Sequence, residues 1–135
     1  MKTKMRTLVA TLAVAAIATT VGAQSASATT YGWAAQKIVV GQKIYSDLAP
    51  AFNNGFSISA DQWNYASGNG VNVNIRYTLY DAGGVSYGSI DSSGAHGGSY
   101  PPPFTHKWFV GPGNYKVQIW NIGSDPAYTA GNIYQ

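Results

Sequence analysis

The stretch VNVNIRYTLY, residues 71–80, alternates apolar and polar side chains along its length. Successive side chains of a β-strand point to opposite faces, so this alternation predicts a strand with one dry face and one wet face. We expect the odd-numbered residues to line the interior: Val71, Val73, Ile75, Tyr77 and Leu79. Strands that are wet on one side are typical of antiparallel sheets.

Two further stretches show the same alternation. Phe56, Ile58 and Ala60 share one parity in residues 56–61, and Tyr115, Val117 and Ile119 share one in residues 115–120. Less regular β-rich runs occupy residues 37–45, 104–110 and 127–134, and turn-forming Gly, Asn, Asp and Pro clusters separate the runs. About seven strands with regular turns predict a single antiparallel β-sandwich, with a small barrel as the alternative. Residues 48–52 allow one helical turn.

The first 28 residues have the order of a secretory signal. Lys2, Lys4 and Arg6 precede an apolar run at residues 8–21, and small residues end at Ala28. The run is shorter than the ~20 residues of a membrane span, although a retained anchor is the alternative. We therefore expect a signal peptide at residues 1–28 and one β-sandwich domain at residues 29–135. The domain would be extracellular, either free or held at the cell wall.

Charge and composition exclude several classes of function. The precursor carries 8 basic and 5 acidic residues, and three of the basic residues belong to the signal. The remaining domain is neutral, and its sequence has neither a basic run for nucleic acid nor a membrane span. It has no cysteine, which excludes thiol catalysis and thiolate metal sites. All of the 4 Trp, 10 Tyr and 4 Phe lie after residue 28 and can build a core without disulfides.

Two segments carry a family resemblance. YTLYDAGG at residues 77–84, followed by GNYKVQIWN at residues 113–121, resembles the bacterial pre-peptidase C-terminal modules. The resemblance implies a secreted β-sandwich accessory with a binding role. An acidic pair that those modules often carry before the Leu-Tyr-Asp is replaced here by Ile75, Arg76, Tyr77 and Thr78.

The sequence carries no catalytic or cofactor motif. It has two histidines and no glutamate, and a nucleophile elbow or metal-binding His motif does not occur. His106 shares the parity of Phe104 and Trp108, which indicates a core or edge residue. Asp81 and Asp91 flank a Gly-rich segment and are interpreted as turn residues rather than metal ligands. We expect no enzyme activity and no cofactor, although a catalytic triad assembled from distant residues stays an alternative.

Aromatic placement supplies the candidate binding residues. Trp120 shares the parity of Lys116 and Gln118, Tyr80 that of Arg76, and Trp63 that of Ser57 and Ser59, so these rings are expected to point outward. Tyr100 and three prolines end a Gly-rich loop expected at residues 91–103. The predicted ligand-contacting residues are Trp120, Tyr80, Arg76, Tyr100 and Trp63. The alternative, favoured for Trp63, is a bulge that turns the ring inward or a second layer that covers it.

These observations favour a non-catalytic binding module. Its partner would be an extracellular protein, a peptide or a cell-surface polysaccharide, contacted through outward aromatic rings and the Gly/Pro-rich loop. One alternative is a secreted antagonist, either a bacteriocin-like toxin or an inhibitor of an extracellular protease. Another is a structural protein of an extracellular matrix that associates through strand edges.

Overall fold

Nine β-strands occur in the residues that the computed structural model describes, which are 30–52, 55–97 and 101–135. The strands are β1 (Tyr31–Ile38), β2 (Lys43–Tyr45), β3 (Ala49–Ala51), β4 (Phe56–Asn64), β5 (Asn74–Asp81), β6 (Ser86–Ser93), β7 (Phe104–Trp108), β8 (Gly113–Asn121) and β9 (Ala127–Tyr134). They confirm the all-β prediction.

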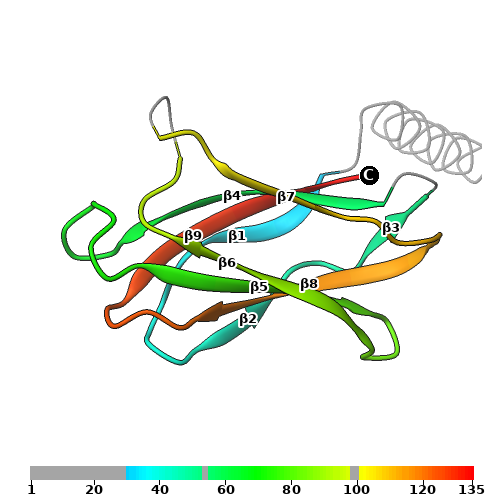
Figure 1. Ribbon diagram of the computed structural model, residues 1–135, viewed down its shortest axis with the longest axis horizontal. Helices are drawn as coiled ribbons and strands as arrows, with labels where there is room; N and C mark the ends of the chain where they lie inside the picture. Colours follow the sequence, from blue (N-terminus) through cyan, green and yellow to red (C-terminus); the bar gives the residue numbers. More distant parts are fainter. Residues whose placement is uncertain (1–29, 53–54, 98–100) are drawn as a thin grey trace, which may run out of the picture. The chain divides into compact units, whose positions relative to one another are not determined.

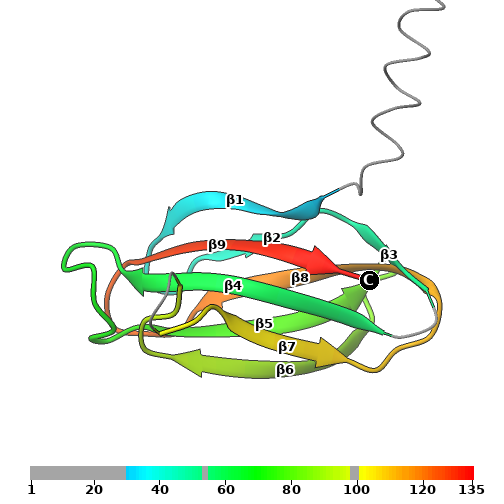
Figure 2. The same ribbon diagram turned by 90° about the horizontal axis from the view of Figure 1, so that it is seen from above.

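The strands form two antiparallel sheets that pack face to face (Figures 1 and 2). The four-stranded sheet has the order β1-β9-β4-β7. The five-stranded sheet has the order β2-β8-β5-β6, and β3 also pairs with β8. Strands β5 and β6 are consecutive in the chain and pair directly. Figure 1 views the sandwich from the side where β7 of one sheet lies next to β6 of the other.

Short edge strands account for the number of strands above seven. The run at residues 37–45 is interrupted by a turn at Gly41, whose φ of 81° is one that glycine adopts without strain. The helical turn expected at residues 48–52 is wrong, because Ala49 and Ala51 pair with β8. Pro50 lacks a backbone N–H, which suits it to this short strand at the edge of the sheet.

The core follows the predicted parity. The inward side chains of β4, β5 and β8 are each at most 5% exposed: Phe56, Ile58, Ala60, Ile75, Tyr77, Leu79, Tyr115, Val117 and Ile119. Val73, which precedes β5, is also buried. The expectation for Val71 is wrong, since its side chain is 57% exposed. Asn72 next to it has a φ of 58°, a left-handed conformation that breaks the extended chain, so β5 begins only at Asn74.

A buried glutamine connects the two sheets through the core. The Gln62 side chain of β4 is fully buried; its Oε1 accepts a 2.7 Å hydrogen bond from the Tyr77 hydroxyl of β5. Its Nε2 donates to the backbone carbonyls of Ser92 (3.0 Å) and Gly94 (2.9 Å). Burial raises the pKa of the Tyr77 phenol, which therefore stays a neutral donor. Gln62 thus fixes the end of β6 against the opposite sheet.

Residues Tyr31–Gln135 form one compact unit. The proposed signal peptide at residues 1–28 lies outside the described residues, and so does Tyr100. Among the described residues, no helix has the length and apolarity needed to cross a membrane.

Candidate functional site

The outer surface of the five-stranded sheet gathers aromatic and basic side chains from three adjacent strands. We call it the aromatic-basic face; its residues are Lys43, Tyr45, Arg76, Tyr80, Lys116, Gln118 and Trp120. The antiparallel register places Trp120 opposite both Lys43 and Arg76, Gln118 opposite Tyr45, and Lys116 opposite Tyr80. Three of the five predicted site residues, Arg76, Tyr80 and Trp120, therefore share one surface.

The Trp120 indole lies between two cations. The Lys43 ammonium is 4.5 Å from the ring centroid, and the Arg76 guanidinium carbon is 5.6 Å from it, distances at which a cation is attracted to an aromatic face. The ring is half-buried, and its Nε1 is enclosed without a hydrogen-bond partner among the described residues. Trp120 therefore points outward as expected, but its surroundings hold it in a defined position.

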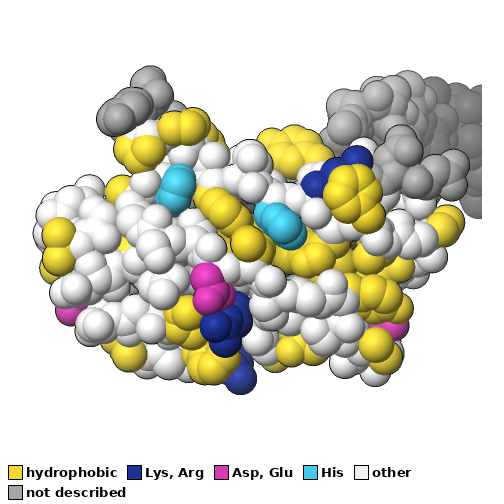
Figure 3. Space-filling model, in the orientation of Figure 1, with side chains coloured by type: hydrophobic (Ala, Val, Ile, Leu, Met, Phe, Trp, Pro, Cys, Tyr) yellow, Lys and Arg dark blue, Asp and Glu magenta, His cyan; other side chains and the backbone are white. Residues whose placement is uncertain are grey.

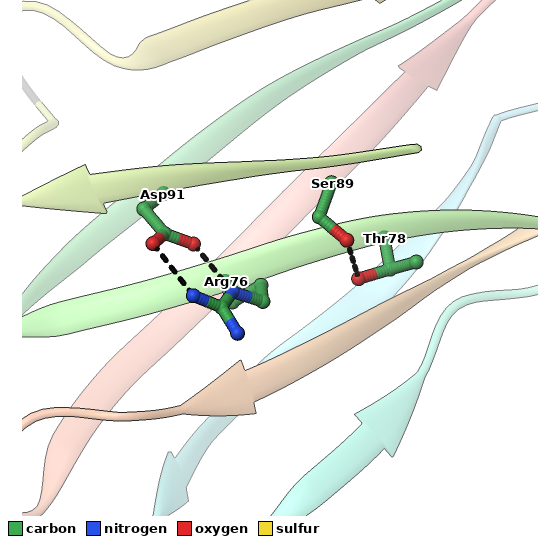
Figure 4. Close-up of polar contacts among 4 residues, drawn as sticks. All are labelled: Arg76, Thr78, Ser89 and Asp91. Atoms are coloured by element: carbon green, nitrogen blue, oxygen red, sulfur yellow. Dashed lines mark hydrogen bonds and ion pairs between the residues drawn. The ribbon is translucent and has the colours of Figure 1, made fainter. Parts of the chain in front are cut away.

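An ion pair fixes the Arg76 side chain (Figure 4). Arg76 Nε and Nη2 donate to the two carboxylate oxygens of Asp91 on β6, at 2.7 and 2.9 Å. This two-bond geometry orients the guanidinium plane. The hydrogen bond from Arg76 holds the pKa of Asp91 below its ordinary value. Next to the pair, the Thr78 and Ser89 hydroxyls are hydrogen-bonded to each other at 2.7 Å.

A hollow opens on the same face, further along β5 toward Tyr80. It has a volume of about 250 Å³ and is lined by Tyr45, Tyr80, Gly84, Lys116 and Gln118. Gln118 Nε2 donates to the Tyr45 hydroxyl at 2.9 Å, and the Lys116 ammonium lies 4.9 Å from the centroid of the Tyr45 ring. Two phenol rings, an ammonium and an amide thus surround a space that could receive a side chain.

The charge on this face is predominantly positive. Lys43, Arg76 and Lys116 lie on it, and in the described structure the Asp91 carboxylate of the adjacent β6 forms an ion pair with Arg76. Figure 3 shows basic side chains meeting an acidic one over the five-stranded sheet. The sequence shows no basic run because each cation comes from a different strand, and only the pairing of β2, β8 and β5 brings them together.

Sequence reasoning missed Lys43, Tyr45 and Asp91. Lys43 and Tyr45 share a parity within the run at residues 37–45, but nothing in the sequence indicates that this run pairs with β8. Asp91 was assigned to a turn, whereas it lies within β6 opposite Arg76. Asp81 does belong to the turn that follows β5, where its Oδ1 accepts a 2.9 Å hydrogen bond from the Val85 backbone N–H.

Trp63 lies on the other side of the molecule. It is part-exposed on the outer surface of the four-stranded sheet, where it stacks on Tyr128 with ring centroids 4.1 Å apart. The register of β4 with β9 is regular through Trp63, so the inward-turning bulge is excluded. Trp63 and Trp120 therefore belong to opposite faces and do not form one site.

The Gly-rich segment is shorter than expected. It was predicted as a loop from residue 91, but β6 continues to Ser93. His96 then forms an isolated bridge with Gln62 through reciprocal backbone hydrogen bonds of 2.7 and 2.8 Å. The Gly97 backbone N–H donates to the carbonyl of Pro101 at 3.1 Å. The described part of this segment is therefore held against β4.

In the described structure the two histidine rings contact aromatic rings and backbone carbonyls. His106 is half-buried on the inner side of β7, with its ring edge-on to Trp108 at 4.6 Å. The ring nitrogens of His96 lie 3.2 and 3.3 Å from the backbone carbonyls of Pro102 and Ser93. In the described part of the chain, neither ring is hydrogen-bonded to a carboxylate or a hydroxyl, and no three metal-ligating side chains come together.

His106 should make the stability depend on pH. Burial lowers its pKa below 6.5 because the imidazolium loses hydration. The unfolded chain then binds the proton more readily, so the His106 contribution is complete above pH 6.5 and is lost as the pH falls through the lowered folded value. We expect melting temperatures measured from pH 8 to pH 5 to fall less steeply for His106→Gln than for the parent. Parallel curves would contradict this assignment.

No family model matches the chain, and no curated protein matches it. A solved structure of the infectious bursal disease virus Gt strain is similar with a TM-score of 0.44 and 11% identity, over 78% of this chain. The match spans 30% of the viral chain.

Proposed function

We propose that the protein is a non-catalytic binding module, and that its aromatic-basic face binds an acidic segment of a partner protein or peptide. The supporting observation is that Trp120, Arg76, Tyr45 and Tyr80 lie side by side on one sheet. Trp, Tyr and Arg are the side chains that most often dominate the binding energy of protein interfaces. The predicted signal peptide supports an extracellular partner.

The contacts within the face support a protein partner over a sugar. Arg76 is paired with Asp91, Thr78 with Ser89, and Gln118 with Tyr45. These polar groups satisfy one another and offer few free partners to the hydroxyls of a sugar. The face therefore presents aromatic rings and cations that are already held in place. Because these groups are ordered before binding, they lose little conformational entropy when a partner binds.

The charges favour an acidic ligand. Lys43 and Lys116 form no ion pair with a described residue. A carboxylate of the partner would therefore form an ion pair with each ammonium group. Such contacts are partly exposed and should weaken as salt rises. An aromatic or apolar side chain of the same partner would fill the hollow between Tyr45 and Tyr80.

Peptide display followed by calorimetry tests this proposal. The purified protein is used to select peptides from a random library, and dissociation constants of the enriched peptides are measured at low and high salt. We expect acidic peptides that contain aromatic or apolar residues. Their affinity should drop about tenfold or more in Lys43→Ala/Lys116→Ala, since each partly exposed ion pair contributes up to ~1 kcal/mol.

The matched control removes the same charge from the other face. Lys37→Ala/Lys107→Ala changes two lysines on the outer surface of the four-stranded sheet and should leave the affinity unchanged. Equal losses in both double variants would show that net charge alone attracts the peptides. Enrichment of basic peptides, or of none, would also refute the proposal.

A further inference from the structure

We infer that the outer surface of the four-stranded sheet is a second binding site, for a linear uncharged glycan. We call this surface the hydroxyl trough. It lies on the opposite side of the sandwich from the aromatic-basic face, and its ligand is of a different class. The inference goes beyond the proposed function and does not depend on it.

The floor of the trough consists of small polar side chains. Ser57 and Ser59 of β4 point outward, with Thr105 of β7 and Asn132 of β9 opposite Ser59. A hollow of about 490 Å³ lies over this region, lined by Ser57, Ile58, Ser59, Thr105, His106, Lys107 and Tyr134. The floor is low because none of its side chains is large.

The polar groups of the floor are available to a ligand. Within the described part of the chain, no side-chain hydrogen bond involves Ser57, Ser59, Thr105 or Asn132. On the aromatic-basic face, by contrast, the corresponding hydroxyls of Thr78 and Ser89 bond to each other. Hydroxyls and amides that both donate and accept are suited to ligand hydroxyl groups, which also do both.

Aromatic rings lie at both ends of β4 on this surface, and the hollow is at the Tyr134 end. Tyr134, 55% exposed, lies opposite Ser57, and the Trp63–Tyr128 stack lies six residues further along β4. At about 3.3 Å per strand residue, the two ends are ~20 Å apart. The C–H faces of sugar rings pack on aromatic side chains, so a short oligosaccharide lying along β4 would contact a ring at each end and the polar floor between them.

The charges favour a neutral ligand. Lys107 lies at one end of the trough and Lys37 at the other, while Asp61 lies between them on β4. The Asp61 carboxylate at the centre would repel an anionic chain, and the cations at the ends would repel a cationic one. A chain with many hydroxyls and no charge matches this arrangement.

Calorimetric titration with defined sugars tests the inference. The probes are linear hexasaccharides and disaccharides of β-1,4-linked glucose, N-acetylglucosamine, xylose and mannose. We expect at least one hexasaccharide to bind with a dissociation constant below about 1 mM, and its disaccharide to bind at least tenfold more weakly. Ser59→Val and Thr105→Val remove one hydroxyl each, keep side chains that suit a strand, and should each weaken binding about fivefold.

Aromatic variants and a control on the opposite face complete the test. Trp63→Ala should reduce the affinity tenfold or more. If that variant does not fold, Tyr134→Ala at the exposed end should give the same loss. Lys43→Ala/Lys116→Ala should bind the hexasaccharide as the parent does, although it binds the acidic peptide about tenfold more weakly. Absence of binding by every neutral hexasaccharide, or full binding by both valine variants, would overturn the inference.

Discussion

Gln62→Leu should lower the free energy of unfolding by about 2 kcal/mol or more, because a buried polar group left without a partner costs ~1–3 kcal/mol and two would be left. These groups are the Tyr77 hydroxyl and the backbone carbonyl of Gly94, which lies beyond the end of β6. Leucine is close to glutamine in size, so the loss would come from hydrogen bonding rather than from a cavity. Urea denaturation followed by tryptophan fluorescence measures the change.

Two controls identify the cause of that loss. Gln36→Leu makes the same exchange at an exposed position and should change the stability by less than about 0.5 kcal/mol. Combining Gln62→Leu with Tyr77→Phe removes the orphaned hydroxyl and should recover about 1 kcal/mol or more. A double variant less stable than Gln62→Leu would contradict the assigned hydrogen bond.

Trp120→Ala should weaken binding of the selected acidic peptides about 30-fold or more, which is the ~2 kcal/mol typical of an interface hot spot. Alanine removes the ring on which the Lys43 and Arg76 cations lie, so the peptide would lose both the aromatic contact and the position of the cations. Calorimetry with the parent and the variant measures the loss.

Phenylalanine at the same position separates the ring from its N–H. The Trp120 Nε1 has no hydrogen-bond partner in the described structure, so Trp120→Phe loses no hydrogen bond and should keep the affinity within about fivefold. Urea denaturation of both variants distinguishes binding from folding. A loss of stability of about 3 kcal/mol or more in Trp120→Ala, with peptide affinity intact, would show that the ring serves the fold.

The faces of the strands could be predicted from the sequence because burial alone sets their parity. Tyr77 and Leu79 are inside and Arg76 and Tyr80 are outside for that reason. The prediction that Val71 is buried was wrong because hydropathy does not show that the next residue, Asn72, has a left-handed backbone conformation. A strand boundary set by one dihedral angle cannot be read from an alternating pattern.

The aromatic-basic face depends on the order of the strands within the sheet. The alternation of apolar and polar residues along one strand does not reveal that order. Trp63 and Trp120 carry the same signal in the sequence, and only the topology places them on opposite sheets. Lys43 reaches Trp120 because β2 pairs with β8, a contact between residues far apart in the chain. The hydroxyl trough could not be predicted from the sequence either. Serine and threonine are common on the solvent-facing side of a strand, and only the strand register shows that these residues lie next to one another.

We propose two separate binding surfaces, one on the outer side of each sheet. NMR measurement of backbone amide chemical shifts, during titration with a selected acidic peptide and then with a binding hexasaccharide, locates the surface that each ligand contacts. We predict that the peptide shifts amides around Arg76, Lys116 and Trp120, that the sugar shifts those around Ser57, Ser59 and Asn132, and that neither ligand displaces the other. Shifts from both ligands on one surface, or confined to the chain ends, would contradict the claim.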